Sequence, residues 1–339
     1  MVDNHETITN LTSGEIASLW ETYQFETLSY CGIMHFLQHV EDEEINTLLK
    51  DTLDVKVKRI ENVKEILTKE GHSIPEGFTE GDVNLKAPRL FSDELYLDYI
   101  LHTFQMEFYN YNWSMVTAVK LSIQQFYQEV MQDTMQLEME AKELSKHKGL
   151  FIKAPEVPAI KHVSYVKKDS FLTGWFGNRR PLLATEISEL VFNAKRNVLG
   201  HAVITAFSQV TETKEVRDFF IKGREISEKH VRVFTDKLKE DYLPSATLGK
   251  VDQVTTSTES PFSNRLMMNF ITTLIASGIG EYGLSMSMSP RHDIGVMYTR
   301  LIAEIAAYAN EGANILINNA WMEEPPMAAD RKKLVKRNE

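Results

Sequence analysis

The segment PRLFSDEL at residues 88–95 and the segment SPFSNRL at residues 260–266 share one short pattern, Phe-Ser followed by polar residues and Leu. Ser92 and Ser263 mark the same point in the two segments, an offset of 171 residues. When the chain is shifted by that offset without a gap, matching residues coincide from end to end. The matches include Glu15 with Glu186, Leu28 with Leu199, Phe36 with Phe207, Tyr111 with Tyr282 and Pro155 with Pro326. A fixed internal offset of this kind predicts a duplicated structural unit.

The repeated Phe-Ser pair also predicts how each copy enters a helix. Serine is favoured at the N-cap, where its hydroxyl accepts a hydrogen bond from a free backbone N–H. The preceding Phe91 and Phe262 would then contact Tyr96 and Met267 inside the helix, as in a hydrophobic staple. Both copies are therefore expected to bring a long loop back into a helix that begins directly after the serine.

Prolines and apolar periodicity divide each copy into four helices. Proline is excluded from helix interiors, and the blocks between prolines carry apolar residues at i, i+3, i+4 and i+7 with little alternation. The predicted helices cover about 12–39, 42–70, 92–117 and 120–148 in the first copy, and about 183–210, 213–241, 263–288 and 290–321 in the second. Pro290, which follows Ser289, is predicted to start the last helix.

The predicted fold is all-α, a tandem duplication of a ferritin-like, up-down four-helix bundle. A loop of about 20 residues joins the second and third helices of each copy, and a long crossover of this kind occurs in ferritin-like bundles. We expect a first bundle at residues 1–150, an aromatic and proline-rich linker at 151–181, a second bundle at 182–324 and a basic tail at 325–339.

Composition argues against several classes of protein. The net charge is −11 and only the end of the chain is strongly basic, so we expect no nucleic-acid partner. The apolar stretch at 266–288 contains Asn269 and Glu281. Because an ionised carboxylate in hydrocarbon is costly, the stretch predicts a buried helix and no membrane partner. Cys31 is the only cysteine, which favours a reducing compartment. The polar, acidic start does not resemble a secretory signal, so the expected location is the cytoplasm.

Polar residues recur at mid-helix core positions, where a ferritin-like metal protein places its ligands. These residues are Glu26, Arg59, His102 and Asp133 in the first copy, and Asn197, His230, Thr273 and Glu304 in the second, with His201 one turn beyond Asn197. Di-metal bundles need Glu-x-x-His pairs on two helices, and no predicted second or fourth helix carries one. Arg59 also places a positive charge where a metal ion would sit.

Two interpretations of this polar layer stay open. The favoured one is a buried hydrogen-bonded network, because buried polar groups need partners. The other is a ligand site in the second copy, where His201, His230 and Glu304 would converge. We predict no catalytic residue, no metal ligand set and no cofactor, and the sequence leans against an enzyme without excluding one.

A second cluster lies on the first helix. Cys31, His35 and His39 share one face at spacing i, i+4 and i+8, and transition metals accept this set of side chains. The aligned residues of the second copy are two alanines and a valine. The face is therefore interpreted as a packing surface or an interface between the copies.

The linker between the copies is rich in proline and glycine and carries Phe171, Trp175 and Phe176. Exposed aromatic side chains are costly, so these residues are expected to pack onto the bundles. The alternative is that they dock a protein partner.

Five segments together resemble a known family: FSDEL, VNLKAPRLFSD, SFLTGWFGNRRPL, EISEKHVRVF and PFSNRLMMNFITTLIASGIGEYG. The chain resembles an uncharacterised two-repeat helical-bundle family of spore-forming Bacilli, often grouped with ferritin-like spore coat proteins of the coat-protein-F type. The resemblance covers nearly the whole chain and implies this fold and this type of organism. It implies no catalytic residues. Arg59 stands where the second copy has His230, which puts a site shared by both copies in doubt.

The sequence therefore predicts a non-catalytic structural protein associated with stress or the spore. The first alternative is a ferritin-like bundle that binds a metal or a small ligand. The second alternative is a protein-interaction scaffold that acts through the linker. A protein partner or a homo-oligomer is compatible with all three.

Overall fold

A computed structural model describes residues 10–174, 179–244 and 251–336 of the chain, and in these ranges it is all-helical, without a β-strand. Eight long helices form two groups of four, followed by a short C-terminal helix. The helices are α1 (Ser13–Leu37), α2 (Glu43–Lys69), α3 (Asp93–Thr117), α4 (Leu121–His147), α5 (Ala184–Val210), α6 (Lys214–Lys239), α7 (Asn264–Ser287), α8 (His292–Asn318) and α9 (Arg331–Lys336).

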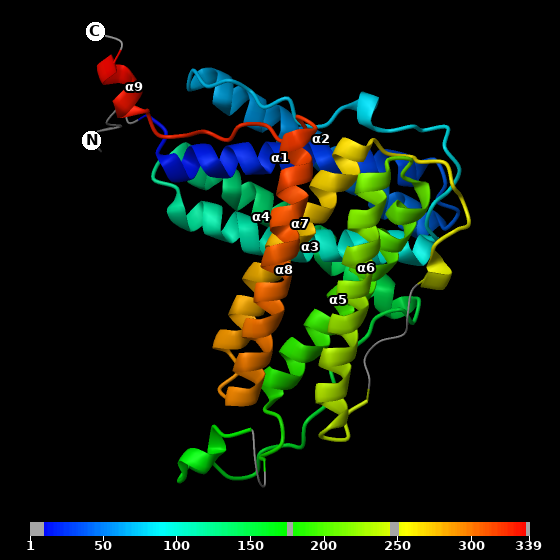
Figure 1. Cartoon of the computed structure of the whole chain (residues 1–339), viewed down its shortest axis with the longest axis vertical. Coiled ribbons are helices and arrows are strands. Elements are labelled where there is room, and N and C mark those ends of the chain that lie inside the picture. The colour runs from blue at the N-terminus through cyan, green and yellow to red at the C-terminus, as the bar shows by residue number, and fades with distance from the viewer. Residues whose placement is uncertain (1–9, 175–178, 245–250, 337–339) are drawn as a thin grey trace.

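Each group of four is built from two helix hairpins. In the first half, α1 packs along α2 and α3 along α4, and the hairpins join through α1 with α3 and α2 with α4. The second half repeats this arrangement with α5 to α8. Its helices run steeply across those of the first half (Figure 1). The chain is therefore all-α with two structural repeats, as the sequence predicts.

The Phe-Ser pattern marks the start of the third helix in each half, and both predicted N-caps are confirmed. Ser92 Oγ accepts a hydrogen bond from the backbone N–H of Leu95 at 3.4 Å. Ser263 Oγ accepts one from the N–H of Leu266 at 3.0 Å. Each serine thus satisfies one of the free donors of the first helical turn.

The last long helix begins later than the sequence predicts. α8 starts at His292, with Arg291 at the N-cap, and not at Pro290. Ser289 Oγ donates a hydrogen bond to the carbonyl of Ser285 at 2.7 Å. The serine therefore closes the end of α7 instead of opening α8.

One apolar core runs through both halves. The larger buried cluster joins residues of the first half, such as Phe36 and Tyr99, to residues of the second, such as Phe207 and Phe270. A smaller cluster around Leu19 belongs to the first half alone. Because α3 and α5 pack across the boundary, the halves share their core, and the division into separate bundles at residues 150 and 182 stays a prediction.

The long connections that follow α2 and α6 meet between the halves. Val83 pairs with Phe262, and Phe91 pairs with Val254, in isolated antiparallel bridges. The segment after α8 returns to the first half, where the Glu323 carboxylate accepts the backbone N–H groups of Glu76 and Gly77 at 2.9 and 2.8 Å. The connection between α6 and α7 and the segment after α8 are thus both held against the first half.

No helix in the described part of the chain is long and apolar enough to cross a membrane. The apolar stretch near residue 270 forms α7, where Leu266, Met267 and Ile271 are buried in the core. Glu281 on this helix forms an ion pair with Arg196 of α5. The stretch is therefore a buried helix, as predicted.

Candidate functional site

The first half encloses four charged side chains at the middle of its helices. Glu26 comes from α1, Lys56 and Arg59 from α2, and Glu107 from α3, and each residue is at most 1% exposed. Two carboxylates and two cations make a set with no net charge. We call these four residues the charge quartet.

Each cation of the charge quartet bridges both carboxylates. Lys56 Nζ lies 2.8 Å from Glu26 Oε2 and also pairs with Glu107. Arg59 Nη1 lies 3.1 Å from Glu26 Oε1 and 2.9 Å from Glu107 Oε2. Buried charges of this kind are tolerated only when they are paired and hydrogen-bonded.

Neutral groups add further hydrogen bonds to the charge quartet. Arg59 Nη2 donates to Thr134 Oγ1 of α4 at 2.7 Å and to a backbone carbonyl of the same helix at 2.9 Å. Thr134 Oγ1 in turn donates to Glu107 Oε2 at 2.9 Å, and the Tyr111 hydroxyl donates to Glu26. All four helices of the first half therefore contribute to one network.

Electrostatics favour the ionised forms of Glu107 and Arg59 in the charge quartet. Burial alone would raise the pKa of Glu107, but the adjacent Lys56 and Arg59 outweigh it, and the pKa lies below its ordinary value. Burial likewise works against the charged form of Arg59, yet Glu107 and Glu26 raise the pKa of its guanidinium further. Burial and the neighbouring Glu26 raise the pKa of Tyr111, so its hydroxyl stays a donor.

Two predicted core residues of the first half lie elsewhere. Asp133 has a side chain that is 33% exposed and lies 3.7 Å from the exposed Lys58. The inward position on α4 is the next residue, Thr134. His102 is buried but does not reach the quartet, because the inward polar residue of α3 is Glu107. His102 instead borders a pocket that is lined mainly by the second half.

The second half replaces the charge quartet with smaller side chains. Under the offset of the repeat, Glu26 corresponds to Asn197, Lys56 to Ser227, Arg59 to His230 and Glu107 to Gly278. Three of these four replacements, Asn197, Ser227 and Gly278, line a cavity of about 80 Å³. The cavity therefore occupies the position where the first half holds its charges.

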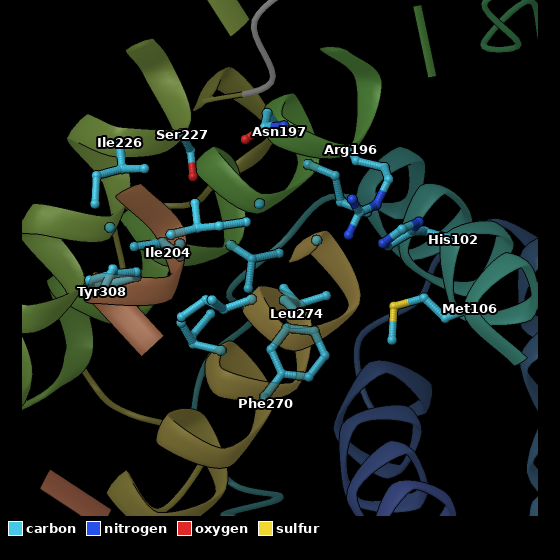
Figure 2. A pocket seen from close by; sticks show the side chains of 18 of the residues that line it. His102, Met106, Arg196, Asn197, Ile204, Ile226, Ser227, Phe270, Leu274 and Tyr308 are labelled. Carbon is cyan, nitrogen blue, oxygen red and sulfur yellow. The ribbon is translucent and has the colours of Figure 1, made fainter. Parts of the chain in front are cut away.

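The walls of this cavity are mostly apolar. Ile204, Leu274 and Phe270 gather around it (Figure 2), with Arg196 and His102 toward the side of the first half. Burial and the nearby positive charge of Arg196 lower the pKa of His102 to about 3, so its imidazole is neutral at physiological pH. A space of this size holds a few water molecules or a small guest, since an engineered cavity of about 150 Å³ takes up benzene.

His230 does not line the cavity but joins two residues that do, Tyr282 and Asn197, through a chain of hydrogen bonds. Its Nδ1 is 3.0 Å from the Tyr282 hydroxyl, which accepts from Asn197 Nδ2 at 2.7 Å. Its Nε2 is 3.1 Å from Glu304 Oε2, and Lys229 binds the same carboxylate at 2.7 Å. Both imidazole nitrogens thus have partners, as the network interpretation of the sequence requires. Burial lowers the pKa of His230 despite the attraction of Glu304.

The three residues of the alternative ligand site do not form a set. His230 and Glu304 touch, but His201 is only half-buried, and its backbone carbonyl accepts from Thr205 one turn along the helix. Among the described residues, no group of three or more His, Cys, Asp or Glu side chains is arranged to hold a metal ion. Thr273 of the same predicted layer lines a separate surface groove.

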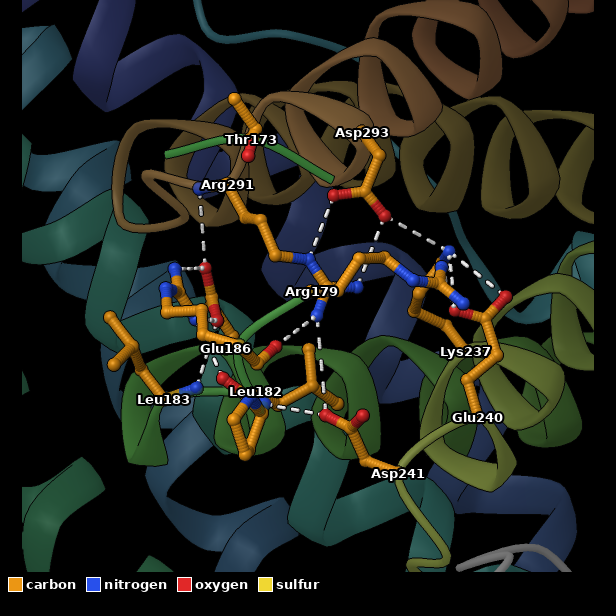
Figure 3. Close-up of polar contacts among 12 residues, drawn as sticks. Thr173, Arg179, Leu182, Leu183, Glu186, Lys237, Glu240, Asp241, Arg291 and Asp293 are labelled. Atoms are coloured by element: carbon orange, nitrogen blue, oxygen red, sulfur yellow. Dashed lines mark hydrogen bonds and ion pairs between the residues drawn. The ribbon is translucent and has the colours of Figure 1, made fainter. Parts of the chain in front are cut away.

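A cluster of ion pairs ties the end of the linker to the second half (Figure 3). Arg291 Nε lies 2.8 Å from Asp293 Oδ1, and its Nη1 donates to the carbonyl of Arg180 at 3.2 Å. Arg180 binds both oxygens of Glu186 at 2.7 Å. Lys237 reaches Asp293 at 3.1 Å. These contacts join the end of the linker to the beginnings of α5 and α8 and to the end of α6.

Cys31, His35 and His39 lie at the boundary between the halves. The His35 ring packs edge-on against Phe262 of the second half at 5.5 Å. His39 Nε2 is 2.9 Å from the carbonyl of Ala87, and Cys31 Sγ donates to the carbonyl of Thr79 at 3.3 Å. Burial raises the pKa of Cys31 to about 12, so the thiol is protonated. The face is thus a packing surface.

Of the three predicted linker aromatics, Phe171 is described and half-buried. The Arg180 guanidinium lies 4.5 Å from its ring centroid, and Arg180 Nε donates to its backbone carbonyl at 2.9 Å. Trp175 and Phe176 lie outside the described residues. Earlier in the linker, Ile160, Val163 and Tyr165 are at least 85% exposed, so the scaffold interpretation stays a prediction.

The profile of one protein family, described as "Protein of unknown function (DUF3231)", matches the chain twice, over residues 1–163 and 170–334. The chain belongs to this family. No curated protein matches. Among solved structures, a proposed spore coat protein from Bacillus halodurans C-125 is similar at 17% identity and a TM-score of 0.40, over 44% of this chain and 98% of that one.

Although the family profile covers both halves, only the first half carries the charge quartet. Sequence reasoning found Glu26 and Arg59 and missed Lys56 and Glu107. A charged residue in a helix is expected on the surface, so neither of the missed residues stood out alone. The available signal is the pair Lys56-x-x-Arg59, because positions i and i+3 share one face of a helix.

Proposed function

We propose that the protein is a non-catalytic, structural protein built on two ferritin-like four-helix bundles. The observation that carries the proposal is the place of Lys56 and Arg59 between Glu26 and Glu107. All four side chains are buried at the centre of the first half, and each cation contacts both carboxylates.

This arrangement parallels a di-metal centre in which cations of the protein replace the metal. Ferritin-like metal proteins take one Glu from each of two helices and a Glu-x-x-His pair from each of the other two. Here Glu26 and Glu107 come from two helices, and α2 carries Lys56-x-x-Arg59 at the i, i+3 spacing of such a pair. The side chains of Lys56 and Arg59 supply the positive charge that a metal ion would otherwise bring.

A core of this kind favours a structural role over chemistry. Each carboxylate is paired with both cations, and all four side chains are buried among the helices, so neither carboxylate is exposed to a substrate. The single cysteine and the polar start favour the cytoplasm, and the sequence resemblance described above favours association with the spore of a Bacilli-type organism.

The proposal is tested by introducing a Glu-x-x-His pair into α2 by mutation. The double variant Lys56→Glu/Arg59→His gives this helix a Glu-x-x-His pair facing Glu26 and Glu107. We expect the folded variant to bind Zn²⁺ or Mn²⁺ in equilibrium dialysis, because carboxylate and imidazole ligands would then converge. Lys58→Glu/Glu61→His, on the exposed face of the same helix, is the control. A folded double variant that binds no more metal than this control would contradict the parallel.

The cavity in the second half favours a second candidate function, the binding of a small uncharged guest. The apolar walls favour an uncharged guest molecule, and the cavity volume of about 80 Å³ limits the size of that molecule. Xenon is a suitable probe, because apolar cavities bind it. We expect xenon to shift the methyl NMR signals of Leu274 and Ile204, and the shifts to vanish in Gly278→Met. Unchanged methyl signals in the wild-type protein would remove this candidate.

A further inference from the structure

The two halves contact each other through equivalent residues of the two repeats. Ser92 N donates to the carbonyl of Gln253 at 2.9 Å, and the equivalent Ser263 N donates to the carbonyl of Asp82 at 2.9 Å. Asp82 and Gln253 are themselves equivalent under the offset of the repeat. These two backbone hydrogen bonds are therefore exchanged by the offset of the repeat.

A second pair of hydrogen bonds follows the same rule. Asn84 N donates to the carbonyl of Pro261 at 2.8 Å, and Thr255 N donates to the carbonyl of Leu90 at 2.9 Å. Asn84 and Thr255 are equivalent, as are Leu90 and Pro261. The bridges of Val83 with Phe262 and of Phe91 with Val254 are exchanged by the same operation.

The aromatic residues between the halves also occur as equivalent pairs, one residue from each half. It contains the equivalent pairs Phe36 and Phe207, Phe91 and Phe262, and Tyr99 and Phe270, all of them buried. Tyr99 and Phe270 contact each other directly, with ring centroids 5.6 Å apart. A residue that contacts its own equivalent lies on a two-fold axis, so these two rings mark its position.

We infer that the two halves form a self-complementary pair, and that the surface between them accepts the matching half of a second copy of this chain. In an isologous interface the same patch serves both partners. The halves of this chain have the geometry of such a dimer, joined by the linker. The surface therefore does not depend on the covalent connection, and halves of two chains can exchange.

The linker permits this exchange. Ile160, Val163 and Tyr165 are at least 85% exposed, and in the described residues 157–168 the linker forms no helix. This inference goes beyond the structural role proposed above, since it concerns how chains associate and does not involve the charge quartet.

The inference is tested by cutting the linker in the folded protein. A protease site inserted after His162 allows cleavage of the full chain without unfolding. We expect the two fragments to stay together in size-exclusion chromatography at micromolar concentration. When tagged and untagged cleaved proteins are mixed, we expect tagged first halves to be recovered with untagged second halves. Fragments that separate after cleavage, or that never exchange, would overturn the inference.

Matched substitutions test the two-fold character. Phe91→Ala and Phe262→Ala remove equivalent buried rings, and each should raise the concentration at which the fragments separate by about a hundredfold. Trp113→Ala removes a ring that is 68% exposed and outside this surface, and should leave that concentration unchanged. A large effect of one phenylalanine and none of the other would contradict a two-fold pair.

Discussion

Lys56 shows how one buried side chain balances the charges at the centre of the first half. Its ammonium group is fully buried and lies within reach of two carboxylates. The free energy of burying such a charge is unfavourable unless the partners compensate for it. Lys56 is therefore part of a balanced set, and the balance is lost when any one member is removed.

Lys56→Met tests this balance at the scale of one residue. The variant leaves Glu26 and Glu107 with only Arg59 between them, so one negative charge is buried without a partner. We expect the free energy of unfolding to fall by about 3–5 kcal/mol in chemical denaturation.

Lys58→Met is the matched control for this change. Lys58 lies on the same helix, but its side chain is 57% exposed, and it pairs only with Asp133 at 3.7 Å. We expect a change of less than about 0.5 kcal/mol. Equal effects of the two substitutions would show that the buried charges are not coupled as described.

At the scale of the element, the starts of α3 and α7 could be predicted from the sequence, whereas the start of α8 and the inward face of α3 could not. Ser92 and Ser263 predict helix starts because a serine hydroxyl can accept a hydrogen bond from a free backbone N–H of the first turn. Both residues are N-caps in the structure. The inward face of α3 was misassigned to His102 because this helix is apolar on most sides. α3 is covered both by its own bundle and by α5 of the other half. Periodicity identifies a face only when one side meets solvent.

The two serine caps predict a graded effect. Both serines cap a helix, so Ser92→Ala is expected to reduce the free energy of unfolding by about 1 kcal/mol. Ser263 Oγ also donates to Asp82 Oδ1 in the other half at 2.7 Å. Ser263→Ala is therefore expected to cost more than Ser92→Ala, which denaturant titration of both variants measures. A larger loss in Ser92→Ala would contradict this assignment of the contact.

At the scale of the whole molecule, the duplication could be predicted from the sequence, but the core shared by the two halves could not. The offset between Ser92 and Ser263 predicts two copies, but it does not say that they face each other. The contact depends on residues that look like ordinary core positions, such as Phe36 and Phe207. Likewise, the cavity of the second half follows from the loss of side chains as large as Glu107 at Gly278. That loss becomes visible only when the packing is known.

The boundary between the halves is expected to be sensitive to acid. Burial and the nearby His39 lower the pKa of His35 from 6.5 to about 4. Between these values the unfolded chain binds a proton at this residue and the folded chain does not. Stability is therefore lost as the pH falls below about 6.5, by up to about 1.4 kcal/mol per pH unit from this group.

Denaturation at several pH values checks this expectation. His35→Gln should make the decline between pH 6.5 and 4 less steep, because one titrating group is gone while the buried His102 and His230 remain. His162→Gln, in the exposed part of the linker, should leave the decline unchanged. A wild-type pH profile that is flat in this range, or is unaffected by His35→Gln, would contradict a buried neutral imidazole at the boundary.

The central claim is that Lys56 and Arg59 occupy the place of a metal between Glu26 and Glu107, and its most direct test is the metal content of the full chain. Untagged protein is incubated with Fe²⁺, Mn²⁺ and Zn²⁺, passed through gel filtration and assayed by elemental analysis. The account predicts far less than one metal ion per chain, with no change in Glu26→Gln/Glu107→Gln. One or more tightly held ions per chain, lost in that double variant, would contradict it.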